Sequence, residues 1–319
     1  MADVPLLIGQ SQAIRRTVTV IERSAEFDVP VLIKGETGTG KELAARMIHY
    51  LSKRRGAPFV PVNCGALPEA LVENELFGCE RGAFTDARQS RHGLIVAAET
   101  GTLFLDEVDS LSARAQAALL RFLQDQTFRP LGASREHTGN VRIVAAASPR
   151  LDALIESGQF RADLAYRLDV LSLKMPPLRE RTGDATLIAR HFADRFATRY
   201  QLPLRNISTA SLQWLERYPW PGNVRELENL VHRHTLLCTD DQLVLCGETS
   251  SAASPGLPGR YQTARDAMLA SWEREYLVGL LRETNGNVTR AAQHAGKERR
   301  ALGKLIKKHG IERVHFAPR

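Results

Sequence analysis

The chain has 319 residues, of which 43% are hydrophobic and 25% charged, a composition that fits a globular protein of two or three domains and argues against disorder. No apolar stretch approaches the roughly twenty residues of a membrane span, and the N-terminus has no signal-peptide character, so we expect a cytoplasmic protein without a membrane partner. The formal charge of +7 is concentrated at one end, because residues 263–319 hold 12 of the 43 Lys and Arg but only 6 of the 36 Asp and Glu.

A glycine-rich loop follows the first expected strand, residues 29–33, and precedes an amphipathic stretch at 43–48. Glycines let successive backbone N–H groups point at one anion, and the helix N-terminus adds its positive dipole end. Lys41 then reaches the outer phosphates as a mobile charge. We therefore predict that a nucleoside triphosphate is bound by Gly35, Glu36, Thr37, Gly38, Thr39, Gly40, Lys41 and Glu42.

The last residue of this loop departs from the general pattern, which ends in Lys followed by Ser or Thr. The hydroxyl of that residue binds Mg²⁺, whereas this chain has Glu42, so a carboxylate elsewhere must help to hold the metal. Asp106 and Glu107 end the expected strand 102–106, and strand ends in an open α/β sheet lie beside the phosphate loop. We assign Asp106 to Mg²⁺ and Glu107 to orienting and deprotonating the attacking water. An Asp-Glu pair alone could equally cap a helix.

Strand-like and helical segments alternate from residue 6 to residue 175. This alternation predicts an α/β fold with a mainly parallel sheet covered by helices on both faces. Pro176 and Pro177 break the pattern, and the chain from 178 to about 245 is expected to be helical throughout. We expect a nucleotide-binding α/β subdomain at 6–175 and a helical lid subdomain at 176–246. The remaining expected strands are residues 59–63, 141–146 and 170–174.

A segment rich in Ser, Pro and Gly separates these subdomains from the basic C-terminal region. This composition is typical of a flexible tether, so we expect a linker at 247–262 and a small all-α domain at 263–319.

Helices are expected at 288–294 and 298–308, joined by a turn at 295–297. This is the layout of a helix-turn-helix, whose second helix enters the major groove of double-stranded DNA. A basic face in contact with solvent alone is the other interpretation. The candidate contacts are Arg299 and Arg300 for bases, Lys307 and Lys308 for phosphates, and Lys304 on the same helix.

Taken together, the motifs resemble those of the AAA+ activators of sigma-54 RNA polymerase, the bacterial enhancer-binding proteins, and the region from about residue 272 resembles their Fis-type helix-turn-helix. The resemblance extends over nearly the whole chain and implies an AAA+ P-loop NTPase fold. It also implies that ATP, with Mg²⁺, is hydrolysed to ADP and phosphate to remodel sigma-54 RNA polymerase from an upstream DNA site. The shared motifs include GETGTGKE at 35–42, ELFG at 75–78, GAFTDA at 82–87, FRADLAYRL at 160–168 and WPGNVREL at 220–227.

The resemblance also assigns roles to individual residues. Asn63 would hydrogen-bond and restrain Glu107. Arg161 and Arg167 would be offered to the γ-phosphate held by a neighbouring subunit, although either arginine alone is more often a surface ion-pair residue. Arg225 would sense the nucleotide from the lid. Because arginines that act in trans require a ring, a homo-oligomer, from dimer to hexamer, is implied.

In the GAFTDA loop, the resemblance makes Phe84 and Thr85 the contacts to the sigma factor. This loop has Asp86 where the family has glycine, and the strand end at Ala147 and Ser148 replaces the family's Thr-Asn. These departures support an alternative, a DNA-binding regulator of the same family that no longer acts through sigma-54.

Most relatives carry an N-terminal receiver or ligand-sensing domain, whereas the ATPase motifs here begin close to Met1. We therefore expect no N-terminal regulatory domain, and control by a partner protein, by expression level or by a paralogue.

Overall fold

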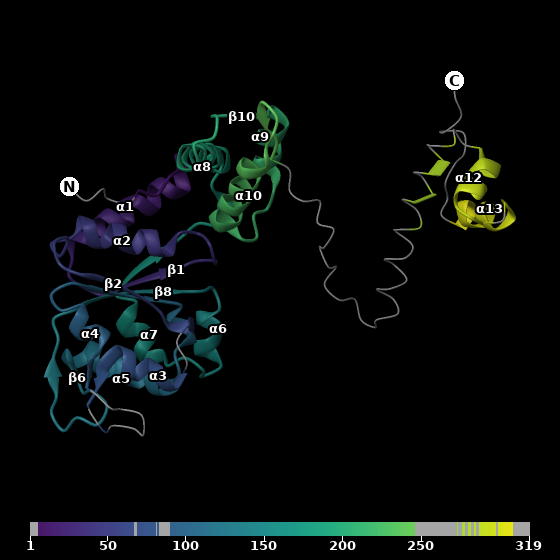
Figure 1. Cartoon of the computed structure of the whole chain (residues 1–319). Coiled ribbons are helices and arrows are strands. Elements are labelled where there is room, and N and C mark those ends of the chain that lie inside the picture. The colour runs from purple at the N-terminus through teal and green to yellow at the C-terminus, as the bar shows by residue number, and fades with distance from the viewer. Residues whose placement is uncertain are drawn as a thin grey trace. The chain divides into compact units, whose positions relative to one another are not determined.

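The computed structural model describes residues 6–66, 69–80, 82, 90–245, 287–297 and 299–308, together with positions 273, 276, 277, 280, 281 and 284. Only the backbone is described at 69–71 and 307–308. The chain divides into two compact units, Met1–Cys246 and Gly247–Arg319, which are treated separately (Figure 1). Several sequence predictions, including Phe84, Thr85, the segment 247–262 and the side chains of Lys307 and Lys308, lie outside the described residues.

A five-stranded parallel sheet forms the centre of the first unit, as predicted. Its order is β2-β5-β8-β1-β9, so β8 lies between the strand before the glycine-rich loop and the strand that ends at Asp106. The observed bounds agree with the predicted ones within two residues. They are β1 (Val31–Lys34), β2 (Phe59–Asn63), β5 (Thr102–Asp106), β8 (Arg142–Ala147) and β9 (Leu171–Lys174).

Helices cover both faces of this sheet, also as predicted (Figure 1). Alternate strand residues enter opposite cores, since Val31 and Ile33 pack with Phe104 whereas Leu32 packs with Leu103. The first face is covered by α1 (Gln12–Glu26) and α2 (Lys41–Leu51). The second is covered by α3 (Glu69–Phe77), α4 (Leu94–Ala97), α5 (Ala113–Asp125), α6 (Leu151–Glu156) and α7 (Ala162–Leu168).

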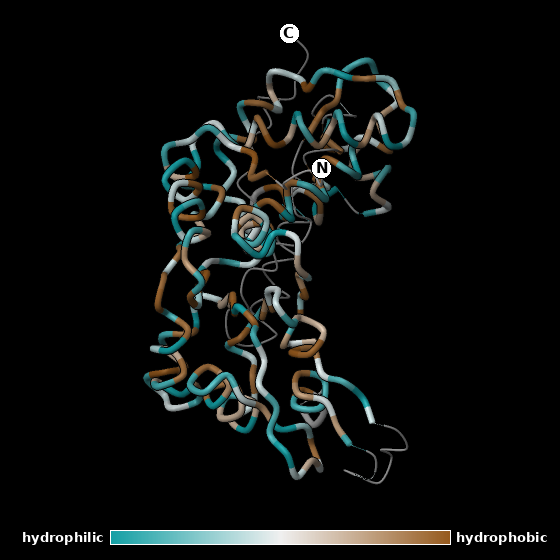
Figure 2. The backbone as a smooth tube through the Cα atoms, turned by 90° about the vertical axis from the view of Figure 1, so that its left-hand side faces the viewer, coloured by the Kyte–Doolittle hydropathy of each residue, from teal (hydrophilic) through white to brown (hydrophobic). Residues whose placement is uncertain are grey.

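Beyond the sheet, three helices form the lid with a core of their own. Ile188, Phe192 and Phe196 are buried along one side of α8, around the buried indole of Trp220. Figure 2 shows hydrophobic and hydrophilic segments alternating along the helices, as expected where one side of a helix is buried. The lid helices are α8 (Asp184–Tyr200), α9 (Thr209–Arg217) and α10 (Asn223–Leu237), and the short turn η3 (Leu178–Glu180) precedes them.

Three short strand pairs among the described residues were not predicted, because two-residue strands show no periodicity in sequence. One of them, β10–β11, makes the prediction that the chain is helical from 178 to 245 wrong at those positions. Another, β3–β4, is antiparallel and encloses the segment 80–90. The pairs are β3 (Gly78–Cys79) with β4 (Arg91–His92), β6 (Thr127–Phe128) with β7 (His137–Thr138), and β10 (Asn206–Ile207) with β11 (Gln242–Leu243).

In the second unit, α12 (Val288–His294) and α13 (Arg299–Lys308) pack together at the predicted positions. The Asn287 side chain accepts hydrogen bonds from the first-turn amides of α12, which explains why that helix begins there. The connecting turn contains Gly296, whose φ of +61° suits glycine. Among the described residues, no helix is both long and apolar enough to span a bilayer.

Candidate functional site

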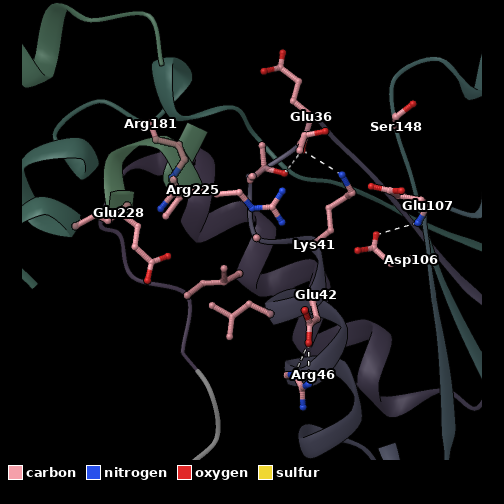
Figure 3. Close-up of a pocket in the computed structure, with 18 of the residues that line it drawn as sticks. Glu36, Lys41, Glu42, Arg46, Asp106, Glu107, Ser148, Arg181, Arg225 and Glu228 are labelled. Atoms are coloured by element: carbon pink, nitrogen blue, oxygen red, sulfur yellow. Dashed lines mark hydrogen bonds and ion pairs between the residues drawn. The ribbon is translucent and has the colours of Figure 1, made fainter. Parts of the chain in front are cut away.

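An open pocket of about 1320 Å³ lies where the carboxyl ends of the parallel strands meet the lid (Figure 3). The glycine-rich loop at residues 35–42, called the phosphate loop below, forms one wall of the pocket. The ends of β5 and β8 form a second wall, and α8 and α10 form a third. This volume exceeds the roughly 300–1,000 Å³ of common small-ligand sites. The pocket therefore has room for a ligand as large as a nucleoside triphosphate.

The phosphate loop reaches its shape through glycines with left-handed backbone. Gly38 has φ +78° and Gly40 has φ +97°, and a Cβ on Gly38 would lie 2.4 Å from the Gly222 carbonyl oxygen. Gly40 is the N-cap of α2 and offers no side chain to the amides of the first turn. Those N–H groups are the donors that an anion needs at a helix N-terminus.

The Lys41 ammonium lies over its own loop, where it donates to the Gly35 carbonyl at 2.8 Å and to the Glu36 carbonyl at 3.1 Å. Burial lowers the pKa of Lys41, and the nearby carboxylates of Asp106, Asp109 and Glu107 oppose that change. The cation is thus held at the mouth of the loop, on the side that faces the strand-end acids.

Asp106 and Glu107 lie at the end of β5, next to this lysine. Burial raises the pKa of Asp106, and the charge of Lys41 opposes the rise most strongly. Glu107 has a left-handed backbone, with φ +54° and ψ +46°, which is uncommon for a residue with a side chain. Its N–H donates to Asp106 Oδ1 at 3.0 Å, and its carbonyl accepts from the Ser110 hydroxyl at 2.6 Å. Strain of this kind is often found at functional sites.

Asn63 pairs with Asp106 in the β2–β5 register, so it lies at the same edge of the sheet. Its Oδ1 accepts from the Ala66 amide at 3.0 Å. Glu107 Oε2 and Asn63 Oδ1 both lie beside Gly65, at 2.4 and 3.4 Å from an ideal Cβ on that glycine. The two side chains are therefore neighbours, but the Asn63 hydrogen bond goes to Ala66 rather than to Glu107.

The donors present fit Mg²⁺ bound together with phosphate rather than a metal held by protein alone. No group of three His, Cys, Asp or Glu side chains able to hold an ion occurs among the described residues. The Glu42 carboxylate is engaged by Arg46 one turn along α2, with nitrogen–oxygen distances of 3.0 and 2.7 Å. Asp106 remains as a carboxylate facing the lysine, and Mg²⁺ commonly uses one or two carboxylates plus phosphate and water.

A set of contacts between the phosphate loop and the lid was missed by the sequence analysis. Arg179 binds both carboxylate oxygens of Glu36, at 2.8 and 2.5 Å, and the Asn223 amide donates to Glu36 Oε2 and to the Thr37 carbonyl, each at 3.1 Å. The hydrogen bonds from Arg179, followed by that from Asn223, lower the pKa of Glu36 to about 2. The Glu36 side chain thus ties the loop to the lid, a role that its place in a phosphate-loop motif does not suggest.

Arg225 lies in the first turn of α10, as predicted, and its side chain points into the pocket (Figure 3). Its Cβ would be 3.0 Å from a Cβ on Gly38, so the start of this helix rests against the phosphate loop. The Val224 amide also donates to the Gly38 carbonyl at 3.0 Å. A group bound in the loop would therefore lie close to the Arg225 side chain.

The end of the pocket away from the strand-end acids has apolar side chains beside charged ones such as Arg181 and Glu228. Leu7 and Ile8 line it from the segment before α1, and Ile188 and Phe192 line it from α8. A buried pair, Arg181 with Asp184, fixes that segment. Arg181 donates to the Ile8 carbonyl at 2.6 Å, and Asp184 accepts from the Gln10 amide and the Ser11 hydroxyl, each at 2.7 Å. A flat apolar group such as a base fits this end.

Arg161 is the N-cap residue of α7 and Arg167 lies in its last turn, and neither residue lines this pocket. Both are exposed, and the Arg161 guanidinium binds both oxygens of Asp163, at 3.0 and 2.7 Å. The backbone N–H of Arg161 donates to the buried Gln116 side chain at 2.9 Å, which anchors the start of α7.

In the second unit, the side chains of Arg299, Arg300 and Lys304 are exposed on α13. They share that helix with Leu302 and Ile306, which are buried. The side chains of these three predicted DNA-contact residues are therefore exposed and lie outside the small core.

Two family matches and several relatives place these observations in context. Residues 7–174 match the family described as the Sigma-54 interaction domain, and residues 179–248 match the AAA+ ATPase lid domain. The transcriptional regulatory protein GlrR of Escherichia coli K12 is 42% identical over 312 residues, which cover 97% of this chain and 69% of that protein. The phenol regulator MopR of Acinetobacter guillouiae is also 42% identical, over 94% of this chain and 56% of that protein.

Solved structures agree with these matches. The crystal structure of NtrX from Brucella abortus has a TM-score of 0.73 at 32% identity, covering 95% of this chain and 69% of that one. NtrX in complex with ATP gives a TM-score of 0.71 at 31% identity, over 96% of this chain and 70% of that one. The predicted AAA+ fold, a parallel sheet with a helical lid, is confirmed.

Proposed function

The chain belongs to the sigma-54 interaction domain family, and we propose that it is an ATPase that activates transcription by remodelling sigma-54 RNA polymerase. One observation carries this proposal. Lys41 and the Asp106–Glu107 turn, within the segment that matches this family, converge on one pocket with Arg225 from the segment that matches the lid domain. NtrX, a relative of similar structure, has been solved with ATP and with ADP, which supports a nucleotide as the ligand.

The proposed reaction is ATP hydrolysis to ADP and phosphate. The amides of residues 35–42 and the Lys41 ammonium bind the phosphates, and the end of the pocket away from the strand-end acids receives the base. Asp106 would hold Mg²⁺ together with the phosphates, and the ion would offset their negative charge. Glu107 orients the attacking water and accepts its proton, and Asn63 restrains Glu107. Arg225 responds to the nucleotide from the lid.

Arg161 and Arg167 act on the nucleotide of a neighbouring subunit in this proposal. Their exposure, and their absence from the pocket lining of their own chain, support a role in trans. An arginine supplied to phosphate in this way is worth roughly 10³–10⁵ in rate in related systems. A ring is then needed for turnover, and we propose a homo-oligomer that assembles from dimers to a hexamer.

Contacts with the transcription machinery lie in two places in this proposal. Phe84 and Thr85 contact the sigma factor from the segment between β3 and β4. The domain at 263–319, after the linker 247–262, is a Fis-type helix-turn-helix that binds upstream double-stranded DNA. Its proposed contacts are Arg299, Arg300, Lys304, Lys307 and Lys308.

Departures from the family pattern at particular residues support a second candidate function. Asp86 and the Ala147–Ser148 strand end depart from the family pattern at the sigma contact and beside the nucleotide. A regulator of the same family that binds DNA but does not act through sigma-54 would tolerate both departures. The domain division, with a nucleotide-binding subdomain at 6–175 and a lid at 176–246, is the same for both functions.

Trapping the chain in a transition-state-like form distinguishes the two. With ADP and a metal fluoride, the wild-type chain should form a stable complex with purified sigma-54, detected by native gel. Phe84→Ala should lose the complex while ATP turnover continues. Failure of the wild-type chain to form the complex, together with normal ATP turnover, favours the second function.

A further inference from the structure

Asp109 accepts two hydrogen bonds from the residue at the end of the neighbouring strand. It lies in the turn η2 (Val108–Ser110), directly after Glu107, while Ser148 is the first residue beyond β8. The Ser148 amide donates to Asp109 Oδ1 at 3.1 Å, and the Ser148 hydroxyl donates to Oδ2 at 2.6 Å. Both oxygens of one carboxylate therefore bind a single residue, and the two side chains line the nucleotide pocket.

Through this contact, the Asp109 carboxylate joins the turn that follows β5 to the residue that follows β8. β8 lies between β1 and β5 in the sheet. The carbonyl of Ala147, the residue before Ser148, accepts from the Gly35 amide at 3.3 Å, which is where the phosphate loop begins. The chain of contacts thus runs from Gly35 through Ala147 and Ser148 to Asp109, and from there along η2 to Glu107.

The Glu107 turn needs such support because its left-handed backbone is costly for a residue with a side chain. Strained conformations persist where surrounding contacts hold them in place. Ser110 already binds the Glu107 carbonyl through its hydroxyl and its amide, at 2.6 and 2.9 Å. Asp109 binds the same turn to Ser148, just beyond β8, so that η2 is held by contacts within the turn and by a contact to the neighbouring strand end.

The contact also occupies the Ser148 hydroxyl. Its single proton is donated to Asp109, and its oxygen accepts from the Arg150 amide at 3.2 Å. A hydroxyl has one donor, so Ser148 could donate to a phosphate oxygen only by releasing Asp109.

We propose that Asp109, through Ser148, is a positioning residue that holds the Glu107 turn against the strand leading to the phosphate loop. Ser148 then serves as the partner of Asp109 and does not contact the transferred phosphate. This proposal rests on the proposed ATPase function for its kinetic consequences, but the contact itself can be tested without nucleotide. The competing account is that the Asp109 charge acts directly on bound metal or phosphate, since Asp109 also influences Lys41.

Steady-state ATP turnover in the full chain separates these accounts. Asp109→Ala and Ser148→Ala should each lower kcat about tenfold with little change in KM, because misplacing a catalytic group costs rate more than binding. The double variant should be no slower than Asp109→Ala, since that substitution already removes both hydrogen bonds from Ser148. Ser148→Thr, which keeps the hydroxyl, should retain most of the turnover. Asp109→Asn keeps the side-chain shape if Asp109→Ala fails to fold.

Three results would overturn the proposal. Losses that multiply in the double variant would show independent roles. Loss in Asp109→Ala with normal turnover in Ser148→Ala would favour the direct charge effect. Normal turnover in both would remove the pair from positioning altogether. Asp125→Asn, at the exposed end of α5, is the control carboxylate and should not change turnover.

Hydrogen–deuterium exchange in the nucleotide-free chain gives the second readout. Amides of residues 107–110 should exchange several-fold faster in Asp109→Asn and in Ser148→Ala, because the turn is held by this contact. Unchanged exchange in both variants would refute the contact's role in holding the turn. If the wild-type chain did not hydrolyse ATP, the proposed function would fail, yet the exchange measurement would still decide the question of positioning.

Discussion

Asn223 connects the lid to the phosphate loop through the hydrogen bonds of its side chain. Its backbone is left-handed, and two substitutions separate the effect of the hydrogen bonds from the effect of the backbone. The residue is fully buried, with a left-handed backbone at φ +52°. Its Oδ1 accepts from the Leu178 amide at 2.8 Å, and its amide donates to the Thr37 carbonyl and to Glu36 Oε2, each at 3.1 Å. Both substitutions remove the hydrogen bonds, but alanine tolerates the left-handed backbone less well than asparagine does, whereas glycine adopts it freely.

The two effects have different magnitudes. Leaving the buried Leu178 N–H without its acceptor costs about 1–3 kcal/mol. A left-handed backbone costs a residue with a Cβ roughly 1–2 kcal/mol more, a cost that glycine does not share. The free energy of unfolding should therefore fall by about 2–5 kcal/mol in Asn223→Ala and by about 1–3 kcal/mol in Asn223→Gly.

Thermal unfolding of the full chain, followed by circular dichroism, measures the difference. Each kcal/mol lowers the melting temperature by roughly 2–4 °C in a unit of this size, so Asn223→Ala should melt at least about 4 °C below wild type. Asn223→Gly should fall between the two. Asn206→Ala, at an exposed position in β10, is the control and should melt like wild type. The reasoning is refuted if Asn223→Ala melts like wild type, or if glycine is the more destabilising replacement.

Further substitutions test the pocket, the ring and the buried histidine. Lys41→Ala should abolish nucleotide binding, while Glu107→Gln should bind ATP with near-normal affinity but lose turnover, as measured by equilibrium binding and phosphate release. Mixing Arg167→Ala with Lys41→Ala should restore part of the ATP turnover, since each supplies what the other lacks; no recovery, with a rate independent of protein concentration, would indicate a site complete in one chain. His49 is buried beside Thr102, and burial lowers its pKa, so the unfolded chain binds a proton that the folded chain resists. Stability should thus fall as pH drops below about 6.5, and His49→Gln should show a smaller loss of melting temperature between pH 7.5 and 5.5; an equal loss in both proteins would contradict this role.

Features encoded locally could be predicted from the sequence. The strand ending at Asp106 and the loop around Lys41 follow from apolar runs and glycine spacing, which act over a few residues. The bounds of α12 follow from the cap at Asn287 in the same way. The parallel sheet then brings these strand ends to one edge, so the nucleotide pocket could be anticipated as well.

Contacts between distant side chains could not be predicted. Arg179 and Glu36 are separated by 143 positions, and Asn223 reaches Thr37 across 186. Asp109 follows Asp106 closely in sequence, but its partner Ser148 lies just beyond another strand, 39 positions away, so nothing local distinguishes Asp109 from a solvent-exposed acid. These pairs depend on how the lid and the strands pack, which single-chain periodicity does not encode.

Transcription reconstituted from purified components tests the central proposal most directly. The full chain, sigma-54 RNA polymerase and a template with a sigma-54 promoter should give transcripts with ATP. They should give none with a non-hydrolysable analogue or with Glu107→Gln. Wild-type protein that hydrolyses ATP but yields no sigma-54-dependent transcript, even at concentrations where the ring is assembled, would contradict the account.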